Sequence, residues 1–283
     1  MTGASGRERA PRNGVFRNGV FRNGMEYVTW GRGTKSLLFV QGGPGSVVPQ
    51  GLLRGLFRRE FDPYLAAGYA VWIVTRRRNM PASHTSADMA DDYARLIAEE
   101  FGGRVDLLVA ESFGGMIGQY LAARHPEAFG HIAMVVTAAE LSAWGKDVDH
   151  RMAAAVAAGD PGGAGSVLAE YVLPGPRARW LRELLGPVVG RGVLGRSGCP
   201  AADVLTEARA ELAFDARSVL PLIRRPVLLL CGGRDAFFPR AVAEETARLI
   251  PDCTLIVYER WGHVRAGSSR RVPRDVLAFV RSR

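Results

Sequence analysis

Short apolar runs, rich in β-branched residues, recur along the chain and are separated by polar or glycine-rich turns. Runs of this length between such turns are typical of buried strands. The earliest strand is predicted at Glu26 to Trp30, behind a hairpin turn at Asn23-Gly24. Buried strands are predicted next at Ser36 to Gln41, Ala70 to Thr75, Val105 to Ala110, His131 to Thr137, Pro226 to Cys231 and Thr254 to Tyr258.

Segments with helical spacing of apolar residues lie between these runs, most clearly at Ala87 to Glu100, Gly115 to Arg124, Ala241 to Leu249 and Pro273 to Arg281. Alternating strands and helices predict an α/β fold, with a mostly parallel sheet covered on both faces. The alternation stops between Ala139 and Leu220, where helical patches such as Asp203 to Leu212 remain. We therefore expect a core of residues 23–138 and 221–283, with a helical lid inserted at 139–220.

The N-terminus contains a short repeat, in which the five residues RNGVF at 12–16 recur at 17–21 and begin again at 22–24. Three short copies cannot build a repeat fold, whose units are about 20 residues or longer. Because five is an odd number, successive copies in one strand would face opposite sides of a sheet. We interpret residues 1–22 as a flexible basic arm.

Composition narrows the function without deciding it. The chain has 283 residues, of which 47% are hydrophobic and 23% charged. It carries neither an apolar run long enough to span a bilayer nor the apolar block of a secretory signal, so no membrane span and a cytoplasmic location are expected. The three cysteines have no metal-binding or disulfide-framework spacing, and no metal site is predicted.

The net positive charge suggests the hypothesis that the protein binds nucleic acid. Five arginines and one glutamate in the first 24 residues account for +4 of the net charge of +9. The only sharp basic run outside this arm, Arg76-Arg77-Arg78, lies beside no RNA-binding signature and no interleaved aromatic residues. We expect this run to be a solvated loop and predict no nucleic-acid partner.

Ser112 stands where a predicted strand meets a predicted helix, in the stretch VAESFGG. A nucleophile at such a bend needs small residues two positions away on each side, and Ala110 and Gly114 meet that need. A serine that caps the following helix is the alternative.

Two further polar residues follow strands later in the chain. Asp235 comes after the strand at 226–231, and His263 comes after the strand at 254–258, so both are expected at the same sheet edge as Ser112. The glycine-rich loop at 41–45 (QGGPG) ends an earlier strand and could direct a backbone amide into the same crevice.

In four ordered motifs the chain resembles the α/β-hydrolase family from about residue 25 to its C-terminus: the loop at 41–45, the elbow at 110–114, and the turns at 233–235 and 262–263. The resemblance implies about eight strands with a lid between the sixth and the seventh. It also implies catalytic roles for Ser112, Asp235 and His263, with the Gly43 and Phe113 amides as the oxyanion hole and no metal or organic cofactor. Gln41 stands where the family often has histidine, and Ala110 where it often has glycine.

Other candidates are weaker. Asp252 competes with Asp235 but precedes a strand, at the wrong edge of the sheet. His84 is placed near the mouth of the site. Glu111 is expected to pair with one of the arginines at 76–78 rather than to act in acid–base chemistry.

These residues predict a serine hydrolase that acts on a carbonyl group through an acyl-enzyme. The substrate is expected to be a carboxylic ester, or a related thioester or carbon–carbon bond, with an apolar acyl or aryl group held by lid residues such as Trp144, Tyr171 and Trp180. Three alternatives stay open: an aminopeptidase similar to proline iminopeptidases, an acyltransferase, and a non-catalytic ligand-binding protein on the same fold.

Overall fold

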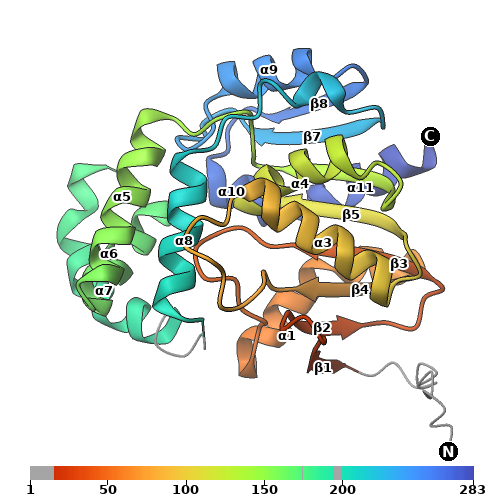
Figure 1. Cartoon of the computed structure of the whole chain (residues 1–283). Helices are drawn as coiled ribbons and strands as arrows, with labels where there is room; N and C mark the ends of the chain where they lie inside the picture. Colours follow the sequence, from red (N-terminus) through yellow and green to blue (C-terminus); the bar gives the residue numbers. More distant parts are fainter. Residues whose placement is uncertain (1–15, 174, 194–198) are drawn as a thin grey trace, which may run out of the picture.

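A computed structural model describes residues 16–173, 175–193 and 199–283, which form a sheet with helices on both faces and a group of helices to one side (Figure 1). Over these residues the sheet has eight strands in the order β1-β2-β4-β3-β5-β6-β7-β8. The β1–β2 and β2–β4 pairs are antiparallel and the others are parallel. The predicted α/β fold with a mostly parallel sheet is therefore confirmed. The strands are β1 Arg17–Val20, β2 Glu26–Trp30, β3 Lys35–Val40, β4 Tyr69–Val74, β5 Val105–Glu111, β6 Phe129–Val135, β7 Val227–Gly232 and β8 Cys253–Tyr258.

Helices cover the two faces of the sheet and bury a separate apolar core on each. One face packs against α3 (Ser86–Glu100), α4 (Phe113–Arg124) and α9 (Arg240–Leu249). The other packs against α1 (Gly51–Glu60), α2 (Asp62–Ala66), α10 (His263–Gly267) and α11 (Arg271–Arg281). Burial on both sides explains why the central strands are continuous apolar runs. The sequence reading missed α1, α2 and the short α10.

Four α-helices of the described chain lie between β6 and β7, inside the segment 139–220, which we call the insertion: α5 Ala143–Ala157, α6 Pro161–Val172, α7 Arg179–Val193 and α8 Ala201–Leu212. Helix α8 lies next to the sheet, and α6 and α7 lie farther out (Figure 1). The α6 and α7 backbones approach closely, since a Cβ on Gly165 would lie only 1.9 Å from the Gly186 carbonyl oxygen. The use of this insertion as a lid stays a prediction.

The second copy of the N-terminal repeat forms part of the sheet, because β1 pairs with β2. The chain turns through a three-residue loop, 22–24, in which Gly24 has a φ of +82° and its N–H donates to the Phe21 carbonyl at 2.9 Å. Phe16 and Phe21, one repeat apart, pack on opposite faces of the sheet. The interpretation of 1–22 as a flexible arm is thus wrong for residues 17–20, and residues 1–15 lie outside the described chain.

Candidate active site

Ser112 lies at a strained turn between β5 and α4, with φ 53° and ψ −119°. Such a backbone conformation costs a non-glycine residue about 1–3 kcal/mol, and the surroundings hold it in place. A Cβ on Gly114 would come within 2.2 Å of the Val40 carbonyl oxygen, which is why only glycine fits there. The Ser112 N–H donates to the Val135 carbonyl at 2.9 Å, so β6 fixes the turn from the other side.

The three predicted catalytic residues are hydrogen-bonded in a row. Ser112 Oγ lies 3.0 Å from His263 Nε2, and His263 Nδ1 lies 2.8 Å from Asp235 Oδ2. The other carboxylate oxygen, Asp235 Oδ1, accepts from the N–H groups of Phe237 and Phe238 at 2.9 and 3.1 Å. The Asp235 side chain is fully buried and has no freedom to turn away.

Aromatic side chains hold the imidazole from the side. The Phe237 ring centroid lies 4.8 Å from that of His263, and Trp144 and Tyr171 pack in turn on Phe237. The competing acid, Asp252, instead forms an ion pair with Arg283 near the start of β8, at the opposite end of that strand from the His263 turn.

The backbone N–H groups of Gly43 and Phe113 are among those beside Ser112 that have no hydrogen-bond acceptor within the described residues. Phe113 is only 1% exposed and begins α4, so its N–H has no acceptor within the helix. Gly43 has a φ of +69°, which glycine adopts without strain. Buried N–H groups without a partner are rare, and helix N-termini attract negative charge. These two groups are available to an anionic oxygen.

A cleft of about 580 Å³ opens over Ser112 and His263, within the usual size range for small-molecule sites. Its floor is the loop at 41–46, and most of its walls are apolar: Phe39, Val47, Pro49, Phe57, Leu168, Tyr171 and Val264. Of the expected insertion residues, Tyr171 lines this cleft and Trp144 lines a neighbouring cavity of about 440 Å³. The expectation for Trp180 is wrong, because its side chain is 67% exposed on α7.

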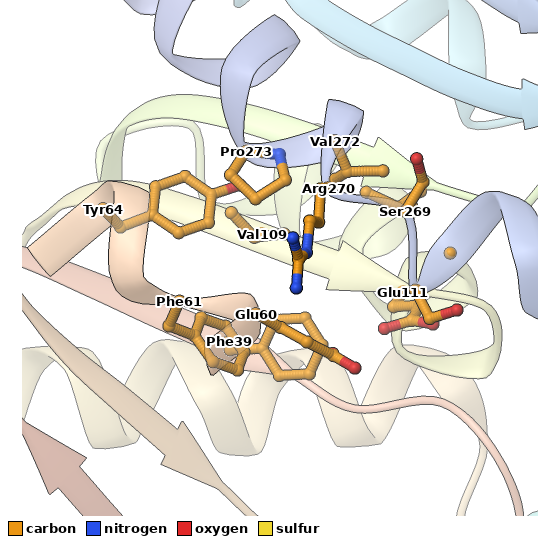
Figure 2. Close-up of a pocket in the computed structure, with 13 residues that line it drawn as sticks. Phe39, Glu60, Phe61, Tyr64, Val109, Glu111, Ser269, Arg270, Val272 and Pro273 are labelled. Atoms are coloured by element: carbon orange, nitrogen blue, oxygen red, sulfur yellow. The ribbon is translucent and has the colours of Figure 1, made fainter. Parts of the chain in front are cut away.

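A smaller cavity of about 40 Å³ adjoins the cleft beneath the elbow and is shown in Figure 2. Glu60, Glu111 and Arg270 line it together with apolar side chains. Burial raises the pKa of Glu111, and burial together with the Glu111 charge raises the pKa of Glu60 to about 7. The buried Tyr64 hydroxyl at this cavity has no hydrogen-bond partner in the described chain.

Three expectations about polar side chains are wrong. The Arg76–Arg78 run is no solvated loop, because Arg76 is fully buried and forms an ion pair with Glu207 of α8. Arg78 pairs with Glu26 and Arg77 lies 3.9 Å from Asp92, and within the described residues Glu111 forms no ion pair with these arginines. His84 contacts Asp92 at 2.8 Å and lines a separate cavity of about 370 Å³, away from the mouth of the cleft.

Two further observations concern metal ions and membranes. Among the described residues, no three histidine, cysteine or acidic side chains are grouped so that they could hold a metal ion. No helix in the same ranges is long and apolar enough to cross a membrane.

Comparison with known proteins then decides the family. A model of the α/β hydrolase fold matches residues 35–265. The chain belongs to the α/β-hydrolase fold family. This α/β hydrolase is 30% identical over 222 residues to a pimeloyl-[acyl-carrier protein] methyl ester esterase of Neisseria meningitidis, covering 74% of the chain and 83% of the relative.

Two further proteins are similar to this chain. A putative carbamate hydrolase of Yersinia enterocolitica is 30% identical over 176 residues, 61% of each chain. A thermophilic esterase from Thermogutta terrifontis has the same fold, with a TM-score of 0.68 at 21% identity over 95% of this chain and 98% of the esterase. The family and the esterase-like class implied by the resemblance are thus confirmed.

Proposed function

We propose that this α/β hydrolase is a serine esterase that cleaves carboxylic esters through an acyl-enzyme on Ser112. The observation that carries the proposal is the row of hydrogen bonds from Asp235 through His263 to Ser112, ending at the apolar cleft. A row of hydrogen bonds with a purely structural role would need neither a strained serine backbone nor unpaired N–H groups beside it.

The first half-reaction follows from these positions. His263 Nε2 takes the Ser112 proton as the oxygen attacks the ester carbonyl, and Asp235 keeps Nδ1 protonated and stabilises the imidazolium. The carbonyl oxygen becomes an oxyanion that the Gly43 and Phe113 N–H groups bind. A donor of this kind lowers the barrier by roughly 3 kcal/mol in comparable sites. His263 then gives its proton to the departing alcohol.

The second half-reaction restores the enzyme. Water enters the cleft, His263 takes its proton, and the hydroxide attacks the acyl carbonyl. The same two amides bind the second oxyanion, and Ser112 leaves with the proton from His263. No metal or organic cofactor takes part in these steps.

The cleft favours a small ester with an apolar acyl or aryl group. Its aromatic and aliphatic walls bury apolar surface at about 25 cal/mol per Å². An ester is also the substrate in the names of the Neisseria and Thermogutta relatives. A methyl ester is therefore one of the compounds to test.

The experiment is a substrate panel on the wild type and Ser112→Ala. It contains p-nitrophenyl esters of two to twelve carbons, a methyl ester, an acyl thioester and an aminoacyl arylamide, each with and without an added alcohol. Hydrolysis of the esters by the wild type only supports the proposal. Preference for the arylamide would favour an aminopeptidase, and transfer to the alcohol in place of hydrolysis would favour an acyltransferase. Ester hydrolysis by Ser112→Ala at the wild-type rate would refute the proposal.

A further inference from the structure

Arg76 is a fully buried cation just beyond the end of β4. Its guanidinium binds the Glu207 carboxylate with two hydrogen bonds, Nε to Oε1 at 2.6 Å and Nη2 to Oε2 at 3.1 Å. Glu207 is also fully buried and belongs to α8, the helix of the insertion that lies beside the sheet (Figure 1). The ion pair therefore joins the insertion to the core.

The other hydrogen bonds of this pair go to the loop at 41–46, and the Arg76 guanidinium also lies over the Phe113 ring, 4.8 Å from its centroid. Arg76 Nη1 donates to the Gln41 carbonyl at 2.8 Å, and Nη2 donates to the Gly43 carbonyl at 2.6 Å. Glu207 Oε2 accepts from the Gly45 N–H at 2.5 Å. Only arginine offers a rigid fork of five donors, so a lysine could not bind one carboxylate and two carbonyls in this geometry.

These contacts fix the backbone on both sides of the Gly43 N–H. The Gln41 carbonyl belongs to the peptide unit before the one that carries this N–H, and the Gly43 carbonyl belongs to the unit after it. Because peptide units are planar, holding both neighbours limits the rotation of the unit between them. Without these contacts the loop would lack that restraint, because its glycines allow many backbone conformations.

We propose that Arg76 and Glu207 are positioning residues, which orient the Gly43 N–H toward the oxyanion and link the placement of α8 to that orientation. For its effect on turnover the inference rests on the proposed esterase function. The buried pair would then stabilise the loop that contains Gln41, the position at which the family often has histidine.

The expected signature is a loss in turnover rather than in substrate binding. A misdirected Gly43 N–H weakens the bond to the oxyanion much more than any bond to the neutral ester carbonyl. We expect Glu207→Gln, which keeps the shape but removes the charge and one acceptor oxygen, to lower kcat about 10- to 100-fold. KM should change less than about threefold.

The chain supplies a matched control in Asp203, which lies one turn before Glu207 on the same face of α8. Its buried carboxylate accepts from the Asn79 and Met80 N–H groups at 2.9 and 2.7 Å, so it anchors α8 without contacting the loop at 41–46. Asp203→Asn should therefore loosen the helix and lower the melting temperature while kcat stays near the wild-type value.

The test compares wild type, Glu207→Gln, Asp203→Asn and Arg76→Lys by ester kinetics, by the affinity for a boronic acid that mimics the tetrahedral intermediate, and by hydrogen–deuterium exchange. We expect Glu207→Gln and Arg76→Lys to lose kcat and boronate affinity in parallel and to exchange faster at residues 41–46. A kcat loss in Glu207→Gln no larger than in Asp203→Asn, with unchanged exchange at 41–46, would overturn the inference. If the wild type hydrolysed no ester, the proposed function would fail, and the exchange at 41–46 would still decide whether the pair holds the loop.

Discussion

The sheet and the insertion contribute to the site in different ways. Ser112, Asp235, His263 and Gly43 all come from loops at strand ends, where buried backbone on both sides fixes each position. The insertion contributes cleft walls, Leu168 and Tyr171, and the buried contact through Glu207. We therefore propose that the sheet loops carry the chemistry and that the insertion helps to select the acyl group.

The insertion itself is attached unevenly. Asp203 and Glu207 tie α8 to the core through buried hydrogen bonds. By contrast, α7 exposes apolar side chains, among them Trp180, Leu184 and Val188. Changes at Glu207 should therefore reach the chemistry, whereas changes at Asp203 or on the outer face of α7 should not.

The largest effect is expected on the sheet side, at Asp235→Asn. The asparagine amide would face His263 Nδ1 with a donor and impose the wrong imidazole tautomer, which lowered the rate about 10⁴-fold in the best-studied triad. We expect a similar loss of kcat/KM with an unchanged circular dichroism spectrum. Asp252→Asn is the control, and a loss of the same size there, with Asp235→Asn unaffected, would mean that the acid is assigned to the wrong residue.

A smaller effect is expected on the insertion side, at Leu168→Ala. Shortening this wall should move the optimal acyl chain toward longer esters, with changes in relative kcat/KM of about 10-fold, typical of a few methylene groups. Leu184→Ala on α7 removes the same atoms from a side chain that is 66% exposed and should leave the ester profile unchanged. Equal profiles for Leu168→Ala and wild type would assign selectivity to the sheet loops.

A pH-dependent effect of a few degrees in Tm is expected between α5 and α8. Asp149 and Glu211 influence each other there, and burial raises the pKa of both carboxyls. A carboxyl with a raised folded-state pKa binds its proton more tightly when folded, so stability falls as pH rises from its ordinary value of about 4 through the raised value.

Glu211→Gln replaces one of these two titratable carboxyls with an amide, which does not titrate. Its Tm relative to wild type should therefore increase between pH 4.5 and pH 8, by about 2–4 °C for each kcal/mol regained. The exposed Glu183→Gln serves as the control and should show no such trend. A pH-independent Tm difference for Glu211→Gln would contradict the raised pKa of Glu211.

The smallest effect is expected at the N-terminus. Deleting residues 1–11 removes a polar, glycine-containing stretch that can bury little apolar surface, so Tm and kcat should stay within error of wild type. Deleting residues 1–24 is the contrast, because it removes β1 and leaves β2 as an unpaired edge. In thermal melts the protein without residues 1–24 should have a clearly lower Tm than the protein without residues 1–11. Equal Tm values would mean that β1 has no structural role.

The contrast between the sheet and the insertion also explains which features could be predicted from the sequence. Strands β2 to β8 begin within two residues of their predicted starts, because burial on both faces leaves an unbroken apolar run. The grouping of Ser112, Asp235 and His263 followed from their order after strands, although their catalytic roles stay predictions. Arg76 was misjudged because a run of arginines is usually solvated, and its partner Glu207 lies 131 positions away. Acidic residues at 203, 207 and 211, on one face of a predicted helix, were the available signal.

The most direct test of the account is to trap the acyl-enzyme. The protein is mixed with a slowly deacylating p-nitrophenyl ester, quenched in acid, and examined by intact-mass and peptide mass spectrometry. We expect one acyl group per chain, located on Ser112 and absent in Ser112→Ala. An acyl group on another residue, or ester turnover that persists in Ser112→Ala, would contradict the assignment of Ser112 as the nucleophile.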